Sequence, residues 1–121
     1  MSENPLALGA IVYPGFEMLD LFGPLEMFSM VPRDKLTIHM VAENTGPVPA
    51  ALNLEITGPK VIAEYGFDDA PTLDLLLLPG GVGTLTELEN PRMLAFLGKR
   101  ARAARITPGT RMPTMIRSCR N

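Results

Sequence analysis

The sequence predicts an α/β domain built on a doubly wound, mostly parallel sheet of the flavodoxin-like sandwich type. Two short apolar runs, within residues 6–12 and 74–78, are typical of strands buried on both faces, and a turn containing proline and glycine follows each of them. Stretches with helical periodicity lie between the predicted strands, which favours parallel pairing. At 46% apolar and 20% charged residues, the 121-residue chain has the composition of a globular protein.

The first half of the chain predicts strands separated by a helical stretch. Residues 6–12 form the first strand, which the turn Tyr13-Pro14-Gly15 ends. In the helical stretch that follows, Gly23-Pro24 is expected to interrupt the helix and to begin a second segment with the proline in its first turn. Residues 35–42 alternate as a second strand, and residues 48–56 are expected to form one or two short strands.

The second half predicts one strand, one helix and a tail. Residues 74–78 form the strand that Pro79-Gly80-Gly81 ends. Asn90-Pro91 is placed as the N-cap and first residue of an amphipathic helix. Residues 106–121 have neither strand nor helix periodicity and contain no acidic residue. We therefore expect a folded domain over residues 1–105, followed by an atypical, disordered tail at residues 106–121.

Charge is distributed unevenly along the chain. Residues 1–91 hold all 13 carboxylates but only three of the 11 basic residues, whereas residues 92–121 hold the other eight and no carboxylate. This asymmetry is typical either of a nucleic-acid-binding arm or of two unlike stretches of polypeptide. No aromatic residue is interleaved with the arginines of the tail, and half of the charge lies on a predicted helix face. Nucleic-acid binding is therefore ranked last.

Several classes of protein are disfavoured by the sequence. No apolar run approaches the ~20 residues of a membrane-spanning helix, and the first residues lack the basic and apolar regions of a secretory signal. Cys119 is the single cysteine, which excludes an internal disulfide framework and fits a reducing compartment. We expect a cytoplasmic protein with no membrane contact, no metal and no cofactor.

Two groups of residues follow predicted strands, at the edge where α/β sheets place their sites. Glu17 and Asp20 lie three residues apart. A carboxylate there can act as a general acid or base, or can simply favour a helix N-terminus. Gly80 and Gly81 can bring backbone N–H groups close to a developing oxyanion, or can form a tight turn and nothing more. Neither a dinucleotide nor a phosphate-loop spacing is present.

Cys119 and His39 are the other residues with reactive side chains. A catalytic cysteine in this class of fold needs a helix N-terminus after it to lower the pKa of its thiol, and Cys119 is two residues from the last residue of the sequence. We interpret Cys119 as an exposed residue with no catalytic role. His39 alternates with apolar neighbours in a predicted strand and has no recognisable partner, which favours a structural role.

The chain resembles the ThiJ/PfpI superfamily of class I glutamine-amidotransferase-like proteins over roughly residues 6–105, and within it the isocyanide-hydratase-like branch. This superfamily also includes glyoxalase III and deglycase-type proteins and the sensor halves of some AraC-type regulators. The pairing of two motifs makes the resemblance specific. They are LDLFGPLEMF at residues 19–28 and LDLLLLPGG at residues 73–81. Three shorter segments also match the family: Tyr13-Pro14-Gly15, Gly46-Pro47-Val48 and Asn90-Pro91.

The resemblance implies roles for three residues. Asp20 is expected to be the catalytic carboxylate that shuttles a proton beside a cysteine nucleophile. Gly81, with Gly80 beside it in the turn, is expected to supply the backbone donor of the oxyanion hole. The family's cysteine would follow a short strand soon after residue 105, but this sequence has Ile106-Thr107-Pro108-Gly109 there. The resemblance therefore implies that residues 1–105 form a partial domain, the amino-terminal part of the family's doubly wound sheet. Whether the chain is a fragment, a frameshift product or a genuine short form is left open.

The leading interpretation is therefore a domain related to small-molecule hydratases or lyases that is inactive as written, because the nucleophile elbow is absent. The alternative is a non-catalytic ligand-sensing domain like those fused to AraC-type regulators, although residues 106–121 have no room for their helix-turn-helix pair. The partner in either case is a small-molecule substrate or ligand. A homodimer or other self-association is also expected, since a shortened doubly wound sheet leaves an apolar edge unpaired.

Overall fold

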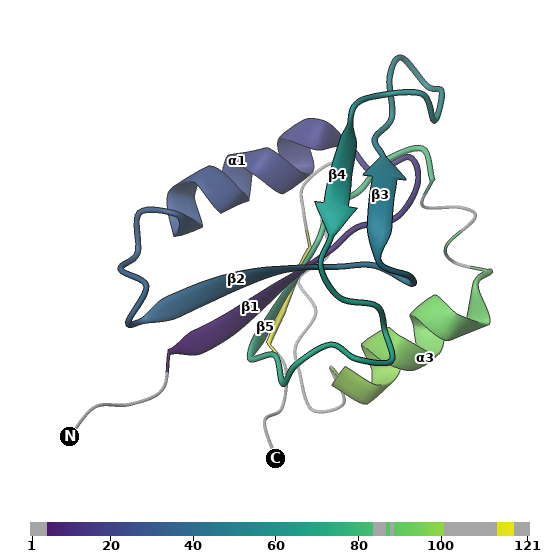
Figure 1. Ribbon diagram of the computed structural model, residues 1–121. Helices are drawn as coiled ribbons and strands as arrows, with labels where there is room; N and C mark the ends of the chain where they lie inside the picture. The colour runs from purple at the N-terminus through teal and green to yellow at the C-terminus, as the bar shows by residue number, and fades with distance from the viewer. Residues whose placement is uncertain (1–4, 84–86, 88, 101–113, 118–121) are drawn as a thin grey trace.

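A four-stranded sheet in the order β2-β1-β5-β6 forms the centre of the fold (Figure 1). The protein is represented by a computed structural model that describes residues 5–83, 87, 89–100 and 114–117, the last four by their backbone. The strands of the sheet are β1 (Leu6–Ile11), β2 (Leu36–Val41), β5 (Leu75–Leu78) and β6 (Thr114–Arg117).

The three predicted strands of the sheet are confirmed, and they pair in parallel. β1 lies between β2 and β5, with Leu6 opposite Leu36 and Leu8 opposite Leu75. A strand in this position is covered on both faces, which is why β1 is almost wholly apolar. The α/β class with a parallel sheet is therefore correct.

Two helices flank this sheet. In Figure 1, α1 (Met18–Phe28) lies above the parallel strands and α3 (Pro91–Arg100) lies below them. α3 begins as predicted, because the side-chain oxygen of Asn90 accepts hydrogen bonds from the N–H groups of Arg92 at 3.0 Å and Met93 at 3.4 Å. Helices on opposite sides of one parallel sheet are the doubly wound arrangement.

The predicted break at Gly23-Pro24 is wrong, because α1 runs through both residues without interruption. Pro24 removes one N–H from the helix. Side chains on both sides of the proline nevertheless pack on the core. Leu21 is fully buried, and Leu25 and Phe28 are partly buried against the core cluster. Apolar burial along the whole helix outweighs the loss of one hydrogen bond.

A small antiparallel hairpin of β3 (Gly46–Pro49) and β4 (Lys60–Ala63) stands beside the sheet (Figure 1). β3 starts two residues before the segment 48–56 in which short strands were predicted, and β4 was not predicted. Two prolines lie in β3, so its sequence lacks the pattern of a strand, and its pairing with β4 depends on contacts distant in sequence. Residues 48–56 contribute the end of β3 and a tight turn at Leu52–Glu55.

β6 was also not predicted, because the sequence of residues 106–121 has no strand periodicity. It pairs antiparallel with β5, with Leu76 opposite Ile116. The remainder of the predicted tail lies outside the described residues, so the expectation of a disordered tail stays a prediction. The sequence also predicts a short helical turn at residues 84–89, and most of these residues likewise lie outside the described ones.

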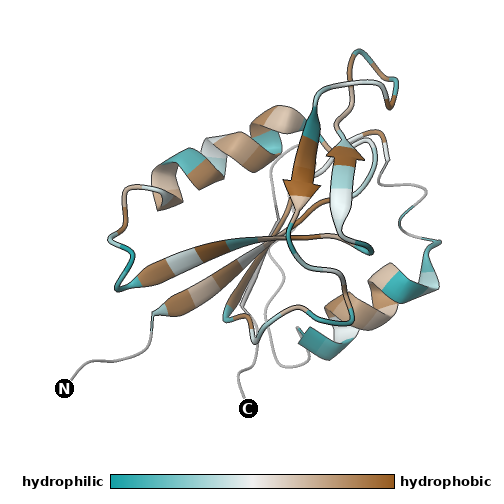
Figure 2. Ribbon diagram, viewed as in Figure 1, coloured by the Kyte–Doolittle hydropathy of each residue, from teal (hydrophilic) through white to brown (hydrophobic). Residues whose placement is uncertain are grey.

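The core lies along the central strands, where hydropathy is highest (Figure 2). The ends of α3 are hydrophilic in the same view. The largest fully buried side chains include Phe16, Leu8, Ile11, Leu21, Leu73, Leu76 and Leu77. Within the described ranges, no helix is long and apolar enough to cross a membrane.

Candidate functional site

The candidate site forms where the loop after β1 meets the turn after β5. The N–H of Glu17 donates a hydrogen bond to the carbonyl oxygen of Gly80 at 2.6 Å, and Phe16 forms an isolated antiparallel bridge with Gly81. β1 and β5 are neighbouring parallel strands, so their carboxyl ends lie at the same edge of the sheet. The fold thus places two segments that are more than 60 residues apart side by side.

Asp20 joins this pair from the first turn of α1. Its Oδ2 accepts a hydrogen bond from the N–H of Gly80 at 3.2 Å, and the residue is half-buried. An open cleft of about 630 Å³ lies over these groups. The residues that line it are Glu17, Leu19, Asp20, Leu54, Gly80, Gly81 and Val82.

Gly81 is at a position that no other residue type fits. Its φ is 146°, and a Cβ there would collide with the carbonyl oxygen of Gly15 and lie 2.7 Å from the nitrogen of Glu17. Both neighbours are backbone atoms and cannot move aside. The N–H of Gly81 makes no hydrogen bond with the other described residues, and Gly81 lines the cleft.

Tyr13 holds the glycine turn in place from the end of β1. Its hydroxyl donates a buried hydrogen bond to the carbonyl oxygen of Pro79 at 2.6 Å. The tyrosine therefore ties β1 directly to the turn that carries Gly80 and Gly81. In the sequence, Tyr13 was recognised as part of the turn after the first strand and of the family resemblance, and neither feature indicated this contact across the fold.

The structure brings the three predicted site residues together. Asp20, Gly80 and Gly81 all line one cleft, as the sequence-based hypothesis requires, although their chemical roles stay predictions. Glu17 lines the same cleft with an exposed side chain. Cys119 lies outside the described residues.

His39 does not line this cleft. Its Nε2 lies 3.0 Å from the hydroxyl oxygen of Thr37, and its ring meets the ring of Tyr65 edge-on at 5.7 Å between centroids. These contacts fit the structural role predicted for His39. Among the described residues, no group of histidine, cysteine or carboxylate side chains is arranged to hold a metal ion.

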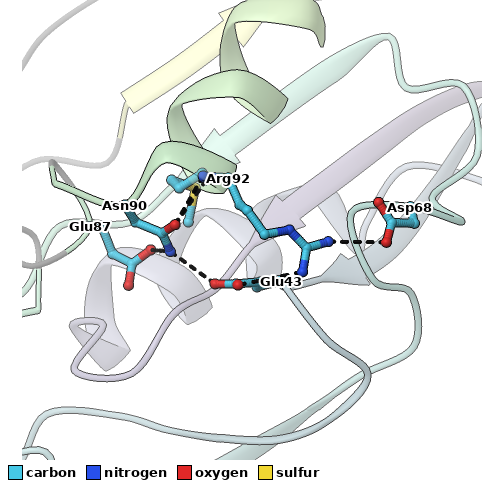
Figure 3. A network of polar contacts seen from close by, with 6 residues as sticks. Glu43, Asp68, Glu87, Asn90 and Arg92 are labelled. Atoms are coloured by element: carbon cyan, nitrogen blue, oxygen red, sulfur yellow. Dashed lines mark hydrogen bonds and ion pairs between the residues drawn. The ribbon is translucent and has the colours of Figure 1, made fainter.

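A second polar cluster lies at the start of α3 (Figure 3). The sequence did not indicate it. The side-chain amide of Asn90 donates to Glu43 at 2.9 Å and to Glu87 at 3.3 Å. Arg92 lies 3.5 Å from Glu43 and 3.1 Å from Asp68. One amide thus bridges two carboxylates whose charges repel each other, and one guanidinium neutralises part of that charge.

Burial raises the pKa of Glu87, the hydrogen bond from Asn90 lowers it, and the charge of Glu43 raises it further, with a net increase. The carboxyl group of Glu87 therefore binds its proton more tightly in the folded protein than in the unfolded chain. The free energy of unfolding accordingly falls as the pH rises from the unfolded-state pKa through the raised pKa of Glu87.

Glu87→Gln is accordingly expected to gain stability relative to the wild type as the pH rises from about 4 to about 7. Urea unfolding at a series of pH values measures this difference. Glu89→Gln, which removes an exposed carboxylate two residues away, is the matched control. A difference between wild type and Glu87→Gln that does not change with pH would contradict the expectation.

Comparison with known proteins supports the same family as the motifs do. No family model matches the chain. A curated relative from Pseudomonas putida, named isonitrile hydratase, is 29% identical over 100 residues. The match covers 83% of this chain and 41% of the relative, so the chain spans about two fifths of that protein's length.

Solved structures agree with this match. A ThiJ/PfpI family protein from Pseudomonas syringae superimposes with a TM-score of 0.71 and 29% identity, over 84% of this chain and 40% of that one. A protein designated VC2308 shares the fold with a TM-score of 0.61 at 19% identity, over 81% of this chain and 48% of that one. In sequence and in fold, the chain is therefore similar to the ThiJ/PfpI superfamily and, within it, to the isonitrile-hydratase-like branch.

Proposed function

We propose that the cleft at Asp20 binds small electrophiles of the isonitrile class, and that this chain holds them without turning them over. One observation carries the proposal. The carboxylate of Asp20 and the N–H of Gly81, which has no hydrogen-bond partner among the described residues, lie at the same cleft. The similarity to a protein named isonitrile hydratase suggests the class of ligand.

The chemistry of hydration explains why these groups belong together. Adding water to an isonitrile gives an N-substituted formamide, so the terminal carbon must receive the oxygen and one proton of the water, and the nitrogen must receive the other proton. In the proposed site the Asp20 carboxylate relays a proton. The N–H of Gly81 donates a hydrogen bond to charge that develops during the addition.

The proposal of binding without turnover rests on the side chains around the cleft. Its described lining contains two carboxylates, three apolar side chains and two glycines, and no cysteine, serine or threonine. A carboxylate and an amide can position a proton and a charge, but neither replaces a thiolate nucleophile.

The test is a titration of the whole chain with cyclohexyl isonitrile, followed by NMR of backbone amides and by assay for the N-cyclohexylformamide product. We expect saturable shifts of the Gly80 and Gly81 amide signals and no product. Asp20→Ala frees the Gly80 N–H and loosens the turn. It is expected to weaken binding about fivefold, the equivalent of about 1 kcal/mol for one hydrogen bond.

Glu17→Ala is the matched control, because it removes a carboxylate from the same cleft and leaves the bond between Asp20 and Gly80 in place. Its binding is expected to stay close to that of the wild type. Absence of a saturable shift at Gly80 and Gly81 would show that the proposed ligand class is wrong. Product that forms in the wild type and disappears in Asp20→Ala would instead show that the chain is an active hydratase.

A further inference from the structure

Leu54 occupies a backbone position that favours glycine. Asn53 and Leu54 have φ values of 51° and 71° and are the two central residues of a tight turn. The turn is closed in both directions, because the N–H of Leu52 donates to Glu55 at 2.6 Å and the N–H of Glu55 donates to Leu52 at 3.0 Å. Asn-Gly is the pair that best fits two such residues, so the asparagine is suited to its place and the leucine is strained.

Packing does not compensate for this strain. The side chain of Leu54 is 81% exposed, the highest exposure among the large apolar residues of the described chain. A bulky residue held in a left-handed conformation without burial is a genuine outlier. Strain that the surrounding structure does not explain is concentrated at functional sites.

The position of Leu54 supplies the functional context. Its side chain lines the Asp20 cleft, together with Leu19 of α1 and Val82 of the turn after β5. Leu19 is 74% exposed and Val82 is 38% exposed. Three segments of the chain therefore surround the polar groups at Asp20 and Gly81 with accessible apolar side chains.

We propose that Leu54 is a specificity-determining residue, whose side chain contacts the organic substituent of the bound isonitrile while the terminal carbon faces Asp20 and Gly81. This role of Leu54 rests on the proposed function and adds that the cleft distinguishes isonitriles by their organic substituent. An apolar substituent covered by Leu54 leaves water, whereas a methyl group has little apolar surface to bury. The cleft is therefore selective for isonitriles with bulky apolar substituents.

The experiment compares two glycine substitutions in the same turn. Leu54→Gly relieves the strain and removes the apolar contact, whereas Asn53→Gly changes the neighbouring residue, which does not line the cleft. Binding of cyclohexyl isonitrile and methyl isonitrile is measured by the shifts of the Gly80 and Gly81 amides. Urea unfolding and size-exclusion chromatography of each variant accompany the titrations.

We expect Leu54→Gly to raise the urea midpoint by roughly half a molar, and to bind cyclohexyl isonitrile about tenfold more weakly while methyl isonitrile is unaffected. Asn53→Gly is expected to retain the preference for the cyclohexyl compound. The same preference in Leu54→Gly as in the wild type would overturn the assignment but leave the proposed function intact. Failure of the wild type to bind either isonitrile would overturn both. A changed oligomeric state in Leu54→Gly would place the leucine at an interface and also overturn the assignment.

Discussion

Gly81→Ala is expected to lower the free energy of unfolding by about 3 kcal/mol or more. The added Cβ would collide with the carbonyl oxygen of Gly15 and lie 2.9 Å from the carbonyl carbon of Phe16. The φ of 146° is also strained for any residue with a side chain. Relief would require the loop after β1 to separate from the turn after β5, which would also dismantle the candidate site.

Urea unfolding of the wild type and Gly81→Ala measures this loss. Gly98→Ala is the matched control, since it makes the same substitution in the exposed part of α3, where nothing lies within 4 Å of the new Cβ. There alanine is expected to stabilise the protein by about 0.5 to 1 kcal/mol, because it favours a helix more than glycine does. Equal stability of the two variants would contradict the close approach at Gly81.

Asp74→Ala is expected to destabilise the fold by about 2 to 3 kcal/mol. Asp74 is 8% exposed and lies just before β5. Its Oδ2 accepts a hydrogen bond from the N–H of Ala7 at 2.8 Å, and its own N–H donates to the carbonyl oxygen of Ala7 at 2.7 Å. Alanine would leave the buried N–H of Ala7 without its acceptor, at the point where β1 and β5 begin to pair.

Asp74→Asn separates this effect from the loss of charge, because the asparagine oxygen can still accept the bond from Ala7. It is expected to cost less than Asp74→Ala in the same urea experiment. Asp68→Ala is the surface control: its side chain is 91% exposed and its ion pair with Arg92 contributes at most about 1 kcal/mol. If Asp74→Ala unfolded at the same urea concentration as Asp68→Ala, the contact with Ala7 would not be stabilising.

The sequence predicted the parallel part of the fold because burial there leaves a local pattern. β1 and β5 are central strands covered on both faces, so their residues are almost all apolar and the turn residues that follow mark their ends. The start of α3 could also be predicted locally, because the capping side chain of Asn90 bonds N–H groups within three residues of itself. These elements could be predicted without knowing what lay beside them.

The elements that were missed depend on partners distant in sequence. β4 forms because β3 lies opposite it, and β6 forms because it pairs with the edge of β5. Each has only four residues, too few to show a clear period of its own. The uninterrupted α1 was missed for a related reason. Proline is penalised locally, whereas the burial that compensates for it comes from the sheet.

The candidate site divides in the same way. The sequence predicted Asp20, Gly80 and Gly81 as site residues. Their places after predicted strands left a purely structural role open for each, and the family resemblance singled them out. The tertiary structure alone decided that Gly80 bonds Asp20, that Tyr13 anchors the turn, and that a strained Leu54 borders the same cleft. Those contacts join segments up to 66 residues apart, and no local pattern records them, because only the pairing of β1 with β5 brings the segments together.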